Sequence, residues 1–82
     1  MPIRLYSNIM KPQIGNRLKV ARAERNLSQG ELAKLVNVTR QTISSIETKQ
    51  YCPSALLALM LAKELDKSVE ELFFLEEIPS GR

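Results

Sequence analysis

The chain has 82 residues, 44% of them apolar, and a formal net charge of +3. This length accommodates one domain with a thin core and argues against a separate catalytic cavity, and the apolar fraction is too high for a disordered chain. The single cysteine excludes an internal disulfide and a cysteine-based metal cluster. Because no signal peptide or membrane-length apolar run is recognised, we expect a cytoplasmic protein.

The charge is distributed unevenly along the chain. Residues 1–52 carry nine Lys or Arg against three Glu, a balance of +6, whereas residues 53–82 carry three Lys or Arg against six Asp or Glu, a balance of −3. A basic half of this kind favours an anionic partner at one end of the molecule. A solvated surface with chance asymmetry is the alternative.

The first predicted elements are an arm and a helix. Two prolines interrupt any helix in residues 1–13, so we expect an N-terminal arm there. Ile14, Leu18 and Ala21 then follow at helical spacing, which predicts a first helix over about 14–25.

Two short amphipathic patterns come next, over about 29–36 and 40–48. Ser28 precedes the first pattern with Glu31 three residues later, a spacing that allows the two side chains to cap the helix reciprocally. Thr39 precedes the second pattern and can accept a hydrogen bond from its first free N–H groups. The local sequence therefore predicts where both helices begin.

The break between these patterns is only three residues wide. Asn37 occupies it, and after glycine Asn best tolerates the positive φ that a chain leaving a helix needs. The small Ala33 permits a second helix to cross closely. Leu32, Ala33 and Val36 form the apolar stripe of the first pattern, and Ile43 and Ile46 form that of the second. Val38 fills the corner between them. Together these features predict a helix-turn-helix, the unit that presents its second helix to the DNA major groove.

Two further helices are predicted after a loop. Ser54 can cap a helix over about 55–65, and Ser68 with Glu71 forms a second capping box at the start of a short helix over 69–73. The brief segment that follows is apolar and β-prone. We expect the domain to end at residue 78 and a disordered tail over 79–82.

The helix over 55–65 is apolar on both sides. One face carries Leu57, Leu61 and Leu65, and the other carries Leu56, Leu59 and Met60. A helix of this kind is usually buried on both sides. Two explanations stay open. Either the tail folds over the second face through Phe74 and Leu75, or the face forms a symmetric homodimer contact.

Arg17 to Phe73 resembles the Cro/C1-type (XRE-family) helix-turn-helix of phage and bacterial repressors, and in pattern it is most similar to small stand-alone regulators of the cytolysin-repressor kind. The resemblance rests on five stretches and on Lys49, Tyr51, Pro53 and Ser54. The stretches are Asn-Arg-Leu-Lys at 16–19, Arg-Ala-Glu-Arg-Asn-Leu-Ser-Gln at 22–29, Glu-Leu-Ala at 31–33, Val-Thr-Arg-Gln-Thr-Ile-Ser-Ser-Ile-Glu at 38–47 and Val-Glu-Glu-Leu-Phe at 69–73. Gly30 departs from the usual Glu, and Asn37 and Asp66 stand where the family favours Gly.

The resemblance implies an all-α, five-helix, lambda-repressor-like domain that binds a palindromic operator as a dimer. It also implies a short antiparallel β pair, here between residues near Ile14 and the segment 74–76. A homodimer and double-stranded DNA are therefore the expected partners. The expected dimer residues are Leu56, Leu59, Met60, Phe74 and Leu75.

The second motif helix presents four polar side chains away from its apolar stripe, namely Arg40, Gln41, Ser44 and Ser45. Arg suits the O6/N7 edge of guanine and Gln the N6/N7 edge of adenine. The family's base-reading positions fall on Arg40, Gln41 and Ser45. Plain solvated surface is the competing interpretation of these residues.

A second set of side chains is expected to contact the DNA backbone and so to carry affinity without sequence information. These residues are Gln29, Thr39, Thr42, Lys49, Tyr51 and Arg17. The family resemblance further implies that Gln29 braces Arg40, and that Arg22 and Glu47 form a partly buried salt bridge joining the first helix to the recognition helix.

An enzyme is not expected, because the chain has no histidine, no Gly-rich phosphate loop and no clustered carboxylates. We predict no cofactor and no metal. The remaining alternative is an antitoxin or adaptor that binds a toxin or other protein through the second face of the helix over 55–65 and the tail.

Overall fold

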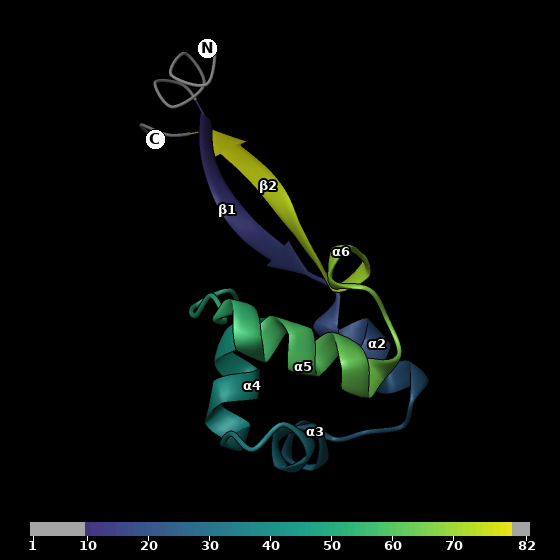
Figure 1. Ribbon diagram of the computed structural model, residues 1–82. Helices are drawn as coiled ribbons and strands as arrows, with labels where there is room; N and C mark the ends of the chain where they lie inside the picture. Colours follow the sequence, from purple (N-terminus) through teal and green to yellow (C-terminus); the bar gives the residue numbers. More distant parts are fainter. Residues whose placement is uncertain (1–9, 80–82) are drawn as a thin grey trace.

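The computed structural model describes residues 10–79, which form five helices and a two-stranded antiparallel sheet. The helices are α2 (Leu18–Glu24), α3 (Gln29–Leu35), α4 (Arg40–Glu47), α5 (Ala55–Leu65) and α6 (Val69–Leu72). The strands are β1 (Met10–Asn16) and β2 (Phe73–Pro79). In Figure 1 the helices pack into one body, and the two strands rise from it together as a ribbon.

The helix starts follow the predicted caps. Ser28 and Ser68 each form a complete capping box with the Glu three residues later. The side chains of Thr39 and Ser54 accept from the backbone N–H groups of Thr42 and Leu57. Each cap satisfies amide donors that have no partner within the helix, so these four predictions are confirmed.

The corner of the helix-turn-helix is also as predicted. Asn37 has a φ of 61° and lies directly after the Val36 cap of α3. Val38 is half-buried beneath the corner, and its N–H donates to the carbonyl of Ala33 at 2.9 Å. Ala33 is 2% exposed and belongs to the buried core.

The core joins all five helices to the start of β2. Its most deeply buried side chains are Leu18, Leu32, Val36, Ile43, Ile46, Leu61, Leu65 and Leu72. Phe73 extends this core as the first residue of β2, and Ile14 of β1 packs against it. The two strands are thereby attached to the helical body at one end of the ribbon.

The first predicted helix was wrong at its beginning. We expected a helix from residue 14, but Ile14 lies in β1 opposite Leu75, and α2 starts only at Leu18. Asn16 marks the junction, because its side-chain oxygen accepts from the N–H of Leu18 at 3.1 Å. The spacing of Ile14 and Leu18 imitates a helical turn, but pairing with a strand about 60 residues away in the chain decides the conformation.

The predicted β pair is confirmed and is longer than expected. Strand β1 pairs with β2 from Met10 opposite Pro79 to Asn16 opposite Phe73. The fold is therefore five helices with a β ribbon and not purely α-helical. The arm boundary expected at residue 13 falls inside β1, and Pro79 of the expected tail belongs to β2. The rest of the expected arm (residues 1–9) and of the tail (80–82) lies outside the described residues.

Gly15 of β1 has no space for a side chain opposite β2. A Cβ atom added to it would lie 2.5 Å from Phe74 Cε1 and 2.7 Å from Glu76 Cδ. The missing side chain thus lets Phe74 and Glu76 lie across β1. Within residues 10–79 no helix is long and apolar enough to cross a membrane.

Candidate nucleic-acid interface

The N-terminus of α4 presents two exposed polar side chains, Arg40 and Gln41. Thr39 caps this end, with its Oγ1 accepting from the N–H of Thr42 at 3.2 Å and lying 3.0 Å from Thr42 Oγ1. The buried Ile43 and Ile46 anchor the opposite side of the helix in the core. Packing and capping together therefore hold the Arg40 end of α4 outward.

Arg40 is not free in solution but held by the preceding helix. Its Nη1 donates to Gln29 Oε1 at 3.0 Å, and Gln29 Nε2 in turn donates to Glu47 Oε1 at 3.0 Å. Gln29 is the first residue of α3, so this bond ties the start of one motif helix to the start of the next. The side chain predicted to brace Arg40 is thus placed where bracing requires it.

Glu47 is the centre of a second set of bonds. Arg22 donates from Nε to Glu47 Oε2 at 2.8 Å and from Nη2 to Oε1 at 3.2 Å. Its remaining Nη1 donates to the carbonyl of Leu27 at 2.8 Å. The side chains of Arg22 and Glu47 are only 14% and 6% exposed, so this is the partly buried salt bridge that the resemblance implied. Removing one partner of such a pair strands the other charge and costs about 3–5 kcal/mol.

Gln41 lies against the next turn of α4. Its Nε2 donates to Ser45 Oγ at a long 3.3 Å, which a base edge or a water can displace. Ser44 and Ser45 are half-buried, and the exposed Tyr51 follows on the loop after α4. A shallow hollow of about 390 Å³ lies beside this face, lined by Val38, Gln41, Thr42, Ser45, Tyr51 and Leu57.

The ammonium group of Lys49, which we expected to contact a phosphate, is bound to a carboxylate of the protein itself. Its Nζ lies 2.9 and 3.0 Å from the two carboxylate oxygens of Glu76, on β2. Glu76 also accepts from Gln13 Nε2 of β1 at 2.9 Å. These two partners, Gln13 first and Lys49 second, hold the pKa of Glu76 below its usual value. Lys49 therefore joins the ribbon to the loop that follows α4.

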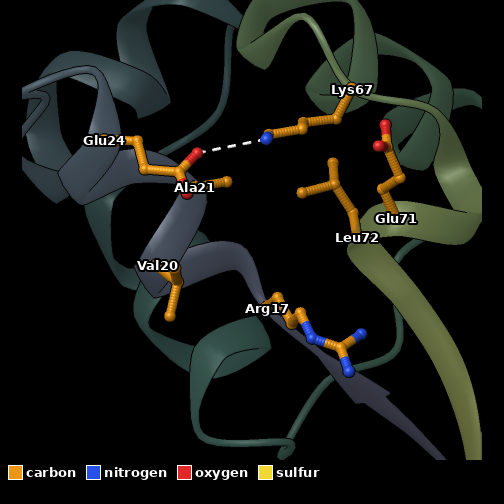
Figure 2. Close-up of a pocket in the computed structure, with 7 residues that line it drawn as sticks. All are labelled: Arg17, Val20, Ala21, Glu24, Lys67, Glu71 and Leu72. Carbon is orange, nitrogen blue, oxygen red and sulfur yellow. Dashed lines mark ion pairs between the residues drawn. The ribbon is translucent and has the colours of Figure 1, made fainter.

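Arg17 is likewise joined to the ribbon. Its guanidinium lies 4.6 Å above the ring centre of Phe74, which is a cation–π contact. The backbone N–H of Arg17 donates to the carbonyl of Leu72 at 2.8 Å. Figure 2 shows Arg17 at one end of a hollow between α2 and α6, opposite the Glu24–Lys67 ion pair of 3.1 Å. Of the predicted backbone contacts, Arg17 and Lys49 are thus held by β2, whereas Gln29 bonds Arg40. Thr39 and Thr42 bond each other at the start of α4.

The residues predicted for a dimer contact fall into two groups. On α5, Leu56 and Leu59 are 68% and 60% exposed and Met60 is half-buried. On β2, Leu75 is 75% exposed and Phe74 is half-buried under Arg17. Figure 1 shows β2 leading away from α5. The tail therefore does not fold over the second face of α5 through Phe74 and Leu75, and that explanation was wrong.

Sequence reasoning missed three side chains that hold the site together. Asn16 donates from Nδ2 to the carbonyl of Ile46 at 2.9 Å and so secures the last turn of α4. Gln13 and Glu76 form the polar contact that fastens the ribbon. Polar residues of this kind carry no local signal, because their partners lie 30 to 63 residues away in the chain.

Comparison with known proteins identifies this arrangement. A family model described as helix-turn-helix matches residues 18–72. The chain belongs to the helix-turn-helix family of Cro/C1-type regulators. Members of this family are DNA-binding regulators of transcription.

Relatives and a solved structure agree with the family. The chain is 45% identical over 62 residues to the uncharacterized HTH-type transcriptional regulator YgzD of Bacillus subtilis and, to the same extent, to one of Methanocaldococcus jannaschii. These matches cover 76% of this chain and 94% of each relative. A crystal structure from Bacteroides fragilis, described as a candidate DNA-binding protein, superposes with a TM-score of 0.69 at 26% identity, over 76% of this chain and all of that one.

Proposed function

We propose that this helix-turn-helix protein is a sequence-specific repressor that binds a palindromic operator in double-stranded DNA as a homodimer. The observation that carries this proposal is the exposed Arg40 guanidinium at the N-terminus of α4, held in place by Gln29. A recognition helix reads base edges with residues at this end. An exposed arginine that is braced in advance of binding loses less side-chain entropy on contact with a base.

The donor geometry of Arg40 suits guanine. Gln29 engages Nη1 and leaves the parallel Nε–H and Nη2–H donors of the same guanidinium for a ligand. Two parallel donors match the O6 and N7 acceptors of guanine in the major groove. Gln41 stands one residue further along, and its amide pairs in the same bidentate way with adenine.

The homodimer rests on the uncovered face of α5. Leu56 and Leu59 are more than half exposed in the single chain, next to the half-buried Met60. A two-fold contact across this face would cover the same patch on both copies. It would also present two α4 helices to one duplex, with half-sites about 34–36 Å apart. Repression then follows from occupancy, since a dimer seated on an operator excludes other proteins from it.

Selection from a pool of random duplexes tests the proposal. We expect the chain to enrich an inverted repeat, and Arg40→Ala to weaken binding to it by ~1–3 kcal/mol while relaxing preference at one base pair per half-site. Arg25→Ala is the matched control, because Arg25 is an exposed arginine at the far end of α2. We expect it to leave the preference unchanged.

A pool without a common sequence would overturn the proposal. It would leave the antitoxin or adaptor alternative, in which the exposed leucines of α5 and β2 contact a different protein. An equal loss on all duplexes for Arg40→Ala would instead assign Arg40 to a phosphate.

A further inference from the structure

Glu47 is linked to the recognition surface although it does not reach it. Its side chain is 6% exposed and belongs to the last residue of α4, whereas Arg40 is the first residue of the same helix. A chain of bonds nevertheless runs from Arg22 to Glu47, from Glu47 to Gln29, and from Gln29 to Arg40. The bond between Glu47 and Gln29 determines which atom of the Gln29 amide faces Arg40.

The carboxylate of Glu47 fixes the orientation of the Gln29 side-chain amide. An ionised carboxylate only accepts hydrogen bonds, so it can face the NH₂ end of the amide but not the oxygen. With Nε2 directed at Glu47, Oε1 is necessarily directed the other way, and it lies 3.0 Å from Arg40 Nη1. The reversed amide would bring its oxygen against the carboxylate and its NH₂ donors against the guanidinium, two contacts that are both unfavourable.

The fixed amide also selects one side of the guanidinium. Because Gln29 accepts from Nη1, the two parallel donors Nε–H and Nη2–H make no bond to Gln29. If the Gln29 amide had no fixed orientation, it would not hold the Arg40 guanidinium. The exposed Arg40 side chain would then sample many rotamers. A mobile arginine contacts phosphates as well as a base edge, so discrimination at its base pair falls.

We propose that Glu47 is a specificity-determining positioning residue, which sets base preference at the Arg40 position by fixing the orientation of the Gln29 amide. This inference rests on the proposed function, because it assumes that Arg40 reads a base. Arg22 stabilises the Glu47 carboxylate with its fork of donors, whereas the orientation of the Gln29 amide depends on that carboxylate being a group that only accepts hydrogen bonds.

The test is Glu47→Gln, measured as a ratio of affinities. The introduced carboxamide can face Gln29 with either its oxygen or its NH₂, so the sense of the Gln29 amide is no longer determined. We expect preference for the selected base at the Arg40 position to fall from about 5- to 150-fold, the range of one bidentate contact, to near that of Arg40→Ala. Preference at the other positions of the half-site stays unchanged.

The ratio separates positioning from stability. A variant that is only partly folded binds every duplex more weakly by the same factor, so the ratio between two duplexes does not move. Arg22→Lys is the matched control, since an ammonium cannot reproduce the guanidinium fork but leaves the Glu47 carboxylate to face Gln29. We expect it to lower stability and to retain the base preference.

A compensating exchange completes the experiment. Gln29→Glu combined with Glu47→Gln places the acceptor-only group at position 29, where it can accept from Arg40 and from the new carboxamide together. We expect the double variant to regain base preference that Glu47→Gln lost. In the free protein, ¹⁵N relaxation of the Arg40 Nε–H should report a mobile side chain in Glu47→Gln and an ordered one in the wild type and the double variant.

The outcomes distinguish this inference from the proposed function. Enrichment of no sequence by the wild-type chain would overturn both. If the wild type enriches an operator and Arg40→Ala loses preference, but Glu47→Gln keeps it, the proposed function stands and the role of Glu47 is refuted. Equal loss of preference in Arg22→Lys and Glu47→Gln with no recovery in the double variant would also refute it.

Discussion

Removing the exposed leucines of α5 should convert the proposed dimer to a monomer. Leu56 and Leu59 are 68% and 60% exposed, so most of each side chain is available for burial against a second copy. Full burial of a leucine stabilises by about 1.5–3 kcal/mol, and burial of this exposed share contributes roughly 1–2 kcal/mol. Two-fold symmetry places both residues in the contact twice. Leu56→Ser with Leu59→Ser should therefore cost about 4–8 kcal/mol of association.

Analytical ultracentrifugation measures this directly. We expect the dissociation constant of the double variant to rise by about 10³- to 10⁶-fold, which makes it monomeric at micromolar concentration. Val20→Ser is the control, since Val20 is 58% exposed on α2 and lies in the hollow of Figure 2. It should leave the mass unchanged. A wild-type chain that is monomeric, or a double variant that stays dimeric, would refute the assignment of this face.

Further predictions concern stability, DNA affinity and pH. Gly30→Ala should raise the free energy of unfolding by about 0.5–1 kcal/mol in a denaturant titration, because α3 gains helix propensity and the nearest atoms, Ser28 Oγ and Arg40 Cδ, lie 3.9 and 4.0 Å from the added Cβ. A loss of stability would show that the added Cβ is not accommodated. Asp66→Gly should stabilise by up to about 1 kcal/mol, since Asp66 ends α5 with a φ of 55°, and an unchanged midpoint would contradict this. If a dimer makes six to ten phosphate contacts, raising the salt concentration from 50 to 200 mM should lower operator affinity by about 10³- to 10⁵-fold. An affinity that does not change with salt would count against the interface. The pKa of Glu76 is lowered on folding from 4.5, so its contribution to stability is present above that pH and is lost as the pH falls below it; Glu76→Gln should flatten this acid limb, and an unchanged limb would remove the ribbon contact from consideration.

The structure also changes what the ribbon means for DNA binding. Lys49 follows the recognition helix, where a phosphate contact is expected, but Glu76 holds its ammonium at 2.9 Å. Lys49 additionally has a φ of 66°, a left-handed conformation that favours glycine.

Local sequence was sufficient for the features whose partners lie within one turn. The capping boxes at Ser28 and Ser68 join residues three apart, and the corner at Asn37 depends on the backbone preference of one residue. The apolar stripes that face α3 towards α4 follow from helical periodicity alone. For this reason the helix-turn-helix, its helix starts and the outward position of Arg40 are all predictable from the order of residues.

Only the tertiary structure decided the conformation and contacts that depend on distant partners. Ile14 has helical spacing to Leu18, but it becomes a strand residue because β2 supplies hydrogen-bond partners from the other end of the chain. Glu76 pairs with Lys49 across 27 positions, and Gln29 reaches Glu47 across 18. Such contacts form because the packed core brings their elements together, and no periodicity in the sequence records which polar side chains will then meet.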